Sequence, residues 1–242
     1  GSGKTTTLYS VLKLIDSPDK NIVTVEDPVE YQLEGINQVT VKPDVGLTFA
    51  SALRSILRQD PNVIMIGEIR DFETVDIAIK SALTGHLVLS TLHTITACGS
   101  VVRLVNMGVE PFMINSSVLC IVAQRLVRKI CVHCKTEDVL AESAIKSLRI
   151  VLPKGQKPVF YRGKGCSRCF NLGYSGRVVI SEVLVLTPKI RDLILNRSQE
   201  HILKRNARAE GMQTLREDGI RAALLGLTSV EEVVRVTAAD EF

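Results

Sequence analysis

Short apolar runs alternate with helix-like segments through the first half of the chain. Three runs rich in aliphatic and β-branched residues predict buried strands at residues 22–25, 63–66 and 87–89. The segments around them carry apolar residues at helical spacing, which predicts helices over residues 4–15, 48–58, 71–83, 95–106 and 111–123. Strands that alternate with helices are typical of an α/β fold in which right-handed crossovers build a parallel sheet.

The second half of the chain follows a different pattern. Residues 125–173 are basic, contain glycine and proline, and carry paired cysteines at either end. Residues 177–186 predict an extended strand, and three or four short helices are expected after it, the last beginning at a capping box of Thr228 and Glu231. We therefore expect three parts: an N-terminally truncated α/β core over residues 1–128, a cysteine-bearing part over 129–174, and a mainly helical part over 175–242.

Composition and charge narrow the class of protein. At 242 residues and 45% hydrophobic content the chain can bury a core, and no apolar run approaches the roughly 20 residues of a membrane span. The net charge of +4 hides an asymmetry, because residues 120–170 contain eleven Lys and Arg against three Asp and Glu. Such a block is compatible with nucleic acid, an anionic membrane or a solvated face beside a metal site. Aromatic residues make up only 4%, so stacking platforms are scarce and nucleic acid is not the expected partner.

The chain begins inside a phosphate-binding motif. Gly-Ser-Gly-Lys-Thr at residues 1–5 is the second half of G-x-x-x-x-G-K-[ST], and we expect a longer protein to supply the first half. In such a loop the backbone N–H groups face phosphate oxygens, Lys4 reaches the β- and γ-phosphates, and the Thr5 hydroxyl joins Mg²⁺. The same triplet also begins ordinary helices, so the motif needs support from the rest of the chain. The candidate nucleotide-binding residues are Gly1, Ser2, Gly3, Lys4, Thr5 and Thr6.

The three predicted strands are each followed by a reactive side chain. The strands run into Glu26, Glu68 and His93, and parallel strands place such residues at the same carboxyl edge, where ligands bind. Phosphoryl transfer needs a group that holds Mg²⁺ and a group that orients or deprotonates water. We expect Glu68 to serve the hydrated Mg²⁺ and Glu26 to act as base, with Glu30 as the alternative. His93 is a candidate contact of the γ-phosphate.

Four arginines are candidates for stabilising the charge of the transition state, within one chain or from a neighbouring subunit. They are Arg54, Arg58, Arg70 and Arg103. A surface ion pair is the competing interpretation of any single one of them.

Two Cys-x-x-Cys pairs, separated by 31 residues, predict a zinc site. Each pair supplies two thiolates to a tetrahedral Zn²⁺, and four cysteines leave no open position for catalysis. The expected ligands are Cys131, Cys134, Cys166 and Cys169. Reduced structural thiols are the alternative, because disulfides are rare in the cytosol. We expect His133 to point outward, and Cys98 and Cys120 to be core residues.

Three longer segments resemble motifs of the secretion ATPases of type II secretion and type IV pilus systems. Val-Glu-Asp-Pro-Val-Glu at residues 25–30 resembles their Asp box, residues 58–71 resemble their atypical Walker B motif ending in glutamate, and residues 84–94 resemble their His box. The likeness continues through the cysteine pairs to Val236, so it covers nearly the whole chain.

The resemblance implies a RecA-like P-loop ATPase domain with a small tetracysteine zinc-binding insertion and a helical C-terminal subdomain. It implies ATP, Mg²⁺ and Zn²⁺ as cofactors. It also implies that Glu26 acts as base, Glu68 serves Mg²⁺, His93 contacts the γ-phosphate and Arg103 acts near the nucleotide.

The resemblance further implies a cytoplasmic homo-hexamer at the inner membrane, bound to a platform protein and a cytoplasmic adaptor, that powers assembly of a pilus or pseudopilus. Within the family, paired cysteines favour the secretion and pilus-extension branch over retraction motors. A nucleic-acid translocase and a docking module without hydrolysis remain the alternatives. In this family an N-terminal half closes over the nucleotide, so we expect this fragment alone to be weakly active or inactive.

Overall fold

The computed structural model describes residues 1–139 and 159–237. The chain divides into two compact units. The first, called the sheet unit, consists of Lys4–Ile121 and Leu184–Ala207. The second, called the cysteine unit, consists of Gly1–Gly3, Val122–Val183 and Arg208–Phe242. Within the described residues, no helix is long and apolar enough to cross a membrane.

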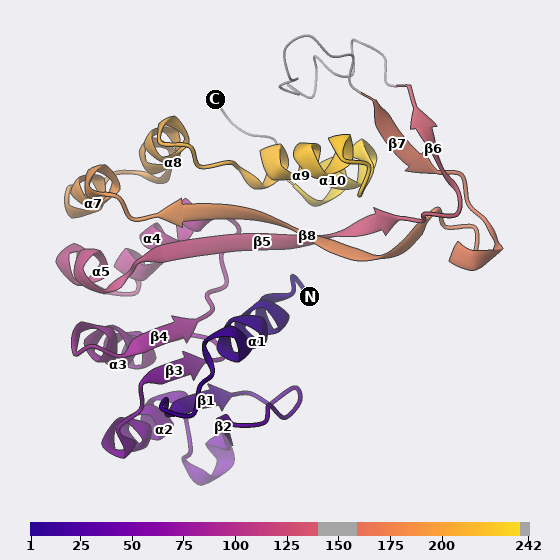
Figure 1. Cartoon of the computed structure of the whole chain (residues 1–242). Helices are drawn as coiled ribbons and strands as arrows, with labels where there is room; N and C mark the ends of the chain where they lie inside the picture. Colours follow the sequence, from indigo (N-terminus) through magenta and orange to yellow (C-terminus); the bar gives the residue numbers. More distant parts are fainter. Residues whose placement is uncertain (140–158, 238–242) are drawn as a thin grey trace. The chain divides into compact units, whose positions relative to one another are not determined.

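The sheet unit is built on four parallel strands in the order β2-β1-β3-β4 (Figure 1). The strands are β1 (Ile22–Glu26), β2 (Asn37–Thr40), β3 (Val63–Ile66) and β4 (Leu87–Ser90). Every residue of β1 and β3 is buried, as expected for central strands of a parallel sheet. The parallel α/β fold expected from the sequence is therefore confirmed.

The sheet unit also contains several helices. They are α1 (Lys4–Ile15), α2 (Phe49–Ile56), α3 (Phe72–Leu83), α4 (Ala97–Asn106), α5 (Pro111–Ser117), α7 (Pro188–Leu195) and α8 (Glu200–Ala209), with short 3-10 turns at Pro43–Val45 and Leu57–Gln59. The helix α1 packs on one face of the sheet, where Tyr9 and Leu12 join Ile22, Val63 and Met65 in one apolar cluster. Because side chains alternate along a strand, Glu26 lies on the same face as Ile22.

Side-chain caps explain why these helices begin where they do. The Asp71 carboxylate accepts the backbone N–H of Thr74 at the start of α3, and Thr48 forms a capping box with Ser51 at the start of α2. The predicted helices over residues 4–15 and 71–83 are confirmed. The helix expected over 48–58 gives way to a 3-10 turn after Ile56.

Three expectations for this region were wrong. The helix predicted over 111–123 ends at Ser117, and the apolar residues after it begin a long strand, β5 (Cys120–Ile130). Cys120 is accordingly exposed on that strand instead of lying in the core, whereas Cys98 is buried. The strand β4 is not buried on both faces, because it lies at the edge of the four-stranded sheet and leaves Leu87 38% exposed.

The cysteine unit contains most of a second, two-stranded sheet formed by β5 and β8 (Tyr174–Val185). A short antiparallel pair, β6 (Lys135–Asp138) and β7 (Phe160–Gly163), lies beside a 3-10 turn at Ser167–Cys169. Phe160 of β7 packs against α9 (Leu215–Leu224) and α10 (Val230–Val236). The strand expected over 177–186 is confirmed by β8.

The start of α10 differs by one residue from the expectation. Ser229, not Thr228, caps the helix by accepting the backbone N–H of Glu232. The Thr228 hydroxyl instead donates to the Arg128 carbonyl oxygen over 2.8 Å. A capping box does form in this unit, but it is made by Thr214 and Glu217 at the start of α9.

Candidate functional site

The carboxyl ends of β1, β3 and β4 meet at one edge of the sheet. Past the strands, the Gly67 N–H donates to the Val25 carbonyl oxygen over 2.8 Å, and the Ile69 N–H donates to that of Thr91 over 3.0 Å. A Cβ atom on Gly67 would lie 3.3 Å from the Val25 oxygen, so this close approach of two backbones favours glycine. The three strands therefore deliver Glu26, Glu68 and His93 to the same edge, as the sequence predicted.

Glu68 lies between two basic side chains. Its Oε2 atom is 2.6 Å from His93 Nε2, and its Oε1 atom forms an ion pair with Arg70. The Glu68 side chain is 15% exposed, whereas those of His93 and Arg70 are 66% and 62% exposed. Burial acts to raise the pKa of Glu68, but the hydrogen bonds and charges of His93 and Arg70 outweigh it and the pKa is lowered. The site therefore presents an ionised carboxylate with two largely exposed basic partners.

Glu26 has a different environment, because it is buried and enclosed by donors. Glu26 is only 3% exposed. Its Oε1 atom accepts the Thr24 hydroxyl over 2.5 Å and the Gln38 amide over 3.1 Å, and its Oε2 atom accepts the Tyr9 hydroxyl. Burial, together with the hydrogen bond to Glu26, raises the pKa of Tyr9 to about 12. Both carboxylate oxygens of Glu26 are thus already engaged by protein donors.

Glu30 follows in the loop between β1 and β2, and its side chain is exposed. Its backbone N–H donates to the Tyr9 hydroxyl oxygen over 3.4 Å. Among the described residues, its carboxylate has no hydrogen bond or ion pair. Glu30 is therefore a free carboxylate held by its backbone close to the enclosed Glu26.

The phosphate-loop residues lead directly into α1. Gly3 has φ +85°, a left-handed conformation that favours glycine, and Lys4 and Thr5 open the first turn of the helix. Within the cysteine unit, the Gln124 amide donates to the Ser2 carbonyl oxygen over 3.1 Å. A helix N-terminus preceded by such a turn presents backbone N–H groups to an anion.

The direction of α1 relative to the sheet follows from two contacts. Tyr9, in the middle of the helix, reaches Glu26 at the carboxyl end of β1. Ile15, its last residue, lines a pocket with Asn62 and Leu87, which lie at the amino ends of β3 and β4. The helix therefore runs from the carboxyl edge towards the amino edge, and Lys4 lies at the end nearer the candidate site.

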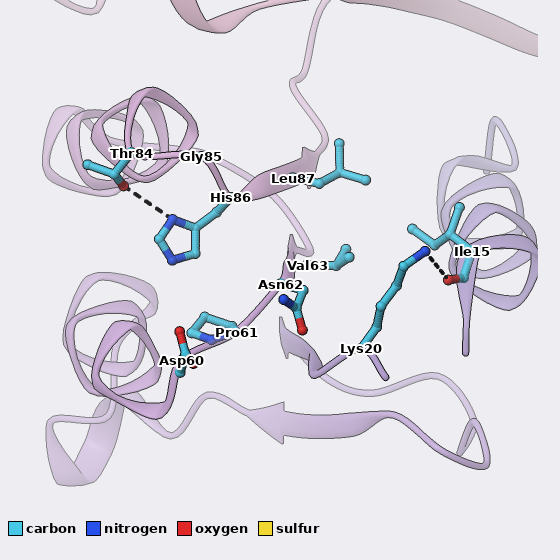
Figure 2. Close-up of a pocket in the computed structure, with 10 residues that line it drawn as sticks. All are labelled: Ile15, Lys20, Asp60, Pro61, Asn62, Val63, Thr84, Gly85, His86 and Leu87. Carbon is cyan, nitrogen blue, oxygen red and sulfur yellow. Dashed lines mark hydrogen bonds between the residues drawn. The ribbon is translucent and has the colours of Figure 1, made fainter. Parts of the chain in front are cut away.

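That pocket is itself remote from the candidate site. It has a volume of about 450 Å³ and is formed by residues that precede the strands (Figure 2). Its His86 Nδ1 atom lies 3.0 Å from the Ser81 carbonyl oxygen, and its Lys20 ammonium donates to the Ile15 carbonyl oxygen over 3.1 Å. It contains none of the site residues predicted from the sequence.

The four candidate arginines have different partners. Arg54 forms an ion pair with Glu73 at 2.6 Å, Arg58 donates to the Arg54 carbonyl oxygen over 2.8 Å, and Arg70 pairs with Glu68. Arg103 is exposed in the last turn of α4, and its guanidinium has no partner in the described part of the chain. Among the described residues, Arg103 therefore differs from the other three candidates in that its guanidinium has no protein acceptor.

The cysteines form a compact cluster in the cysteine unit. All four Sγ atoms lie within 4.8 Å of one another, and three of the Sγ–Sγ distances are 3.9, 3.8 and 3.7 Å. A tetrahedral zinc with bonds of about 2.3 Å requires sulfur atoms about 3.8 Å apart, so the cluster fits zinc. The backbone N–H groups of Cys166 and Gly173 donate to the Cys169 sulfur over 3.2 and 3.3 Å, which favours a thiolate. His133 is exposed and lies 3.2 Å from Arg168 Nη1, outside the cluster.

Together, the parallel sheet, the phosphate-loop residues and the acidic carboxyl edge define a P-loop ATPase domain of RecA-like fold that carries a tetracysteine cluster. The chain belongs to the family described as Type II/IV secretion system protein, whose model matches residues 1–235.

Named relatives agree with this assignment. The chain is 50% identical over 98% of its length to the type IV pilus assembly ATPase PilB of Thermus thermophilus, and 52% identical over 98% to type II secretion system protein E of Pseudomonas aeruginosa. It covers 27% and 47% of these two proteins. Among solved structures, the pilus retraction motor PilT with bound ADP has a TM-score of 0.71 at 31% identity, covering 98% of this chain and 58% of PilT.

Proposed function

We propose that the protein containing this chain is an ATP-hydrolysing motor that powers assembly of a type IV pilus or a type II secretion pseudopilus. The observation that carries the proposal is the carboxyl edge, where Glu68, His93 and Arg70 meet beside the enclosed Glu26. The relatives at about half identity are named for pilus assembly and type II secretion, whereas the retraction motor PilT is 31% identical.

The nucleotide-binding roles follow from charge and position. The N–H groups of the turn before α1 bind phosphate oxygens, and Lys4 neutralises the β- and γ-phosphates. The Thr5 hydroxyl and the Glu68 carboxylate would hold the hydrated Mg²⁺, which supplies charge neutralisation to the phosphates when bound. His93 leaves Glu68 to donate to the γ-phosphate, and Arg70 and Arg103 supply positive charge.

The role of base goes to Glu30 in this proposal, although Glu26 was the first choice from the sequence. A general base needs a lone pair directed at the water whose proton it takes. Glu26 is only 3% exposed, and three of its roughly four lone-pair positions already accept protein donors, whereas the carboxylate of Glu30 is exposed and has no partner among the described residues. Glu26 is then a structural carboxylate beneath the site.

The four cysteines would hold a structural zinc ion. A site with four thiolates has no position for a substrate, so the ion supports local folding and does not take part in hydrolysis. The two Cys-x-x-Cys turns lie at the base of the β6–β7 pair, so the metal would fix this pair against the end of β5. The paired cysteines also support a role in pilus assembly or secretion, because within the family they favour that branch over the retraction motors.

Partners and location complete the proposal. The motor works as a homo-hexamer in the cytoplasm, bound at the inner membrane to a platform protein and a cytoplasmic adaptor. Arginines from a neighbouring subunit then complete the site. Translocation of nucleic acid is the second candidate, favoured by the excess of eleven Lys and Arg over three Asp and Glu in residues 120–170.

The test is ATP hydrolysis by the longer protein with an intact phosphate loop, measured with and without its platform protein and with and without DNA. Stimulation by the platform protein supports the motor. Stimulation by DNA that falls steeply with salt supports the translocase instead. Absence of Mg-dependent hydrolysis under all these conditions contradicts both.

A further inference from the structure

The Tyr9 hydroxyl is the centre of a buried hydrogen-bond network in the sheet unit. It donates to Glu26 Oε2 and accepts the Gln38 amide over 3.3 Å and the Glu30 backbone N–H over 3.4 Å. A tyrosine hydroxyl has one donor and two acceptor positions, so its capacity is fully used here. The residue itself is only 1% exposed. A single oxygen thus connects α1, β1, β2 and the backbone of Glu30.

Gln38 extends the network along the loop that joins β1 to β2, residues 27–36, called the β1–β2 loop. Its amide nitrogen shares two hydrogens among three acceptors, which are Glu26 Oε1, the Tyr9 hydroxyl and the Tyr31 carbonyl oxygen at 3.3 Å. Its Oε1 atom accepts the Leu33 backbone N–H over 2.7 Å. The rings of Tyr9 and Tyr31 pack edge to face with centroids 4.7 Å apart. Three backbone groups of the β1–β2 loop, at Glu30, Tyr31 and Leu33, therefore form hydrogen bonds with the side chains of Tyr9 or Gln38.

We propose that Tyr9 and Gln38 are positioning residues, which hold the β1–β2 loop and its Glu30 in register with α1 through the buried acceptor Glu26. The inference rests on the proposed function, because it assigns Glu30 as the base that these residues place. Lys4 and Thr5 occupy the first turn of the same helix, so the network couples the phosphate-binding end of α1 to the loop. Misplacing a reacting group by about 1 Å can lower a rate by roughly 10².

Burial alone does not explain why residue 9 is a tyrosine and not a phenylalanine. A phenylalanine would fill the space of Tyr9 in the apolar cluster with Leu12 and Met65, and it would bury no hydroxyl. The tyrosine hydroxyl instead makes three hydrogen bonds, which lead to Glu26 at the carboxyl end of β1, to Glu30 in the β1–β2 loop and to Gln38 in β2. In such a site, hydrogen bonds polarise one another and fix geometry more strongly than in water.

The first experiment measures amide hydrogen exchange in this chain. Tyr9→Phe removes the acceptor of the Glu30 N–H, so exchange at that amide should rise roughly tenfold. Gln38→Met removes the acceptor of the Leu33 N–H, so exchange at that amide should rise by a similar factor. Tyr31→Phe is the matched control, because the residue is 55% exposed and its hydroxyl has no partner among the described residues. Unchanged exchange at Glu30 in Tyr9→Phe overturns the inference.

The second experiment measures ATP turnover in the longer protein. Tyr9→Phe should lower kcat by roughly 10- to 100-fold with KM within about threefold, whereas Tyr31→Phe should change neither. If Tyr9 acts through Glu30, Tyr9→Phe should cause no further loss in a Glu30→Gln background. An equal loss in both backgrounds means that Tyr9 does not act through Glu30, and overturns the inference.

The two experiments separate failure of the inference from failure of the proposed function. A wild-type protein without ATP hydrolysis contradicts the proposed function, while loosening of the β1–β2 loop in Tyr9→Phe still supports the network. An active wild-type protein with an equally active Tyr9→Phe variant contradicts the network alone.

Discussion

Replacing Glu26 by glutamine tests whether this residue is a structural carboxylate. The new amide keeps the size of the side chain but has one acceptor oxygen and one donor nitrogen. If the oxygen takes the place of Oε1, it still accepts from Thr24 and Gln38, and the nitrogen then faces the Tyr9 hydroxyl. That hydroxyl oxygen already accepts two N–H groups, from Gln38 and Glu30, so it cannot accept a third.

The cost follows from this count of donors and acceptors. The Tyr9 O–H and the amide N–H that replaces Oε2 are both donors, so at least one buried donor is left without an acceptor, which costs about 1–3 kcal/mol. If the amide is turned over, its nitrogen faces two donors, Thr24 and Gln38, and this orientation costs more free energy than the first. The loss of charge-assisted hydrogen bonds is offset by the lower cost of burying a neutral group. We therefore expect Glu26→Gln to lower the free energy of unfolding by about 1–3 kcal/mol.

Urea denaturation at pH 7, followed by far-ultraviolet circular dichroism, measures this difference. With a slope of about 2 kcal/mol per molar urea, the midpoint should fall by roughly 0.5–1.5 M with an unchanged slope. Glu30→Gln is the matched control, since Glu30 is exposed and should change stability by less than about 0.5 kcal/mol. An unshifted midpoint in Glu26→Gln would show that the enclosed carboxylate is not structural and would return Glu26 to the role of base.

Two further predictions concern the cysteine unit. Metal-replete protein should contain one equivalent of zinc per chain by elemental analysis, and Cys131→Ser should reduce that content without a large change in nucleotide affinity; a wild-type content near zero contradicts the zinc site. Glu232 is buried, and although burial acts to raise its pKa, the hydrogen bonds and charges of Arg235 and Arg128 lower that pKa from 4.5 to about 2. Because its folded-state pKa is lowered, its contribution to stability is complete above pH 4.5 and is lost as the pH falls towards 2. After allowance for the half-exposed arginines, Glu232→Gln should destabilise the unit by about 2 kcal/mol at pH 7, and the difference should shrink below pH 4.5; a pH-independent difference would refute this.

Local signals in the sequence were sufficient for much of the sheet unit. Asp71 at a helix start and the apolar run Val63–Ile66 each act within a few residues, and both predictions were confirmed. The strand β2 was missed because Asn37–Thr40 is short and mostly polar, and it gains its strand structure by pairing with β1. The apolar stretch after Ser117 was assigned to a helix because a short apolar run does not distinguish a helix from a strand.

The site was predictable to the extent that strand ends determine it. Glu68 and His93 follow neighbouring parallel strands, so their contact at 2.6 Å could be expected from the sequence. The enclosure of Glu26 could not, because it depends on Tyr9 and Gln38, which lie 17 and 12 residues away in the sequence. Tyr9 has no sequence signal of its own, since it occupies an ordinary apolar position on the inner face of α1.

The central claim is that the carboxyl edge of this sheet hydrolyses ATP with Glu30 as base. The most direct test is the steady-state ATP turnover of the longer protein carrying Glu30→Gln, compared with wild type at saturating Mg-ATP. The account predicts turnover lower by roughly 10²–10⁴, with Mg-ATP affinity retained because the amide removes only basicity. Turnover of Glu30→Gln close to that of wild type would contradict the account.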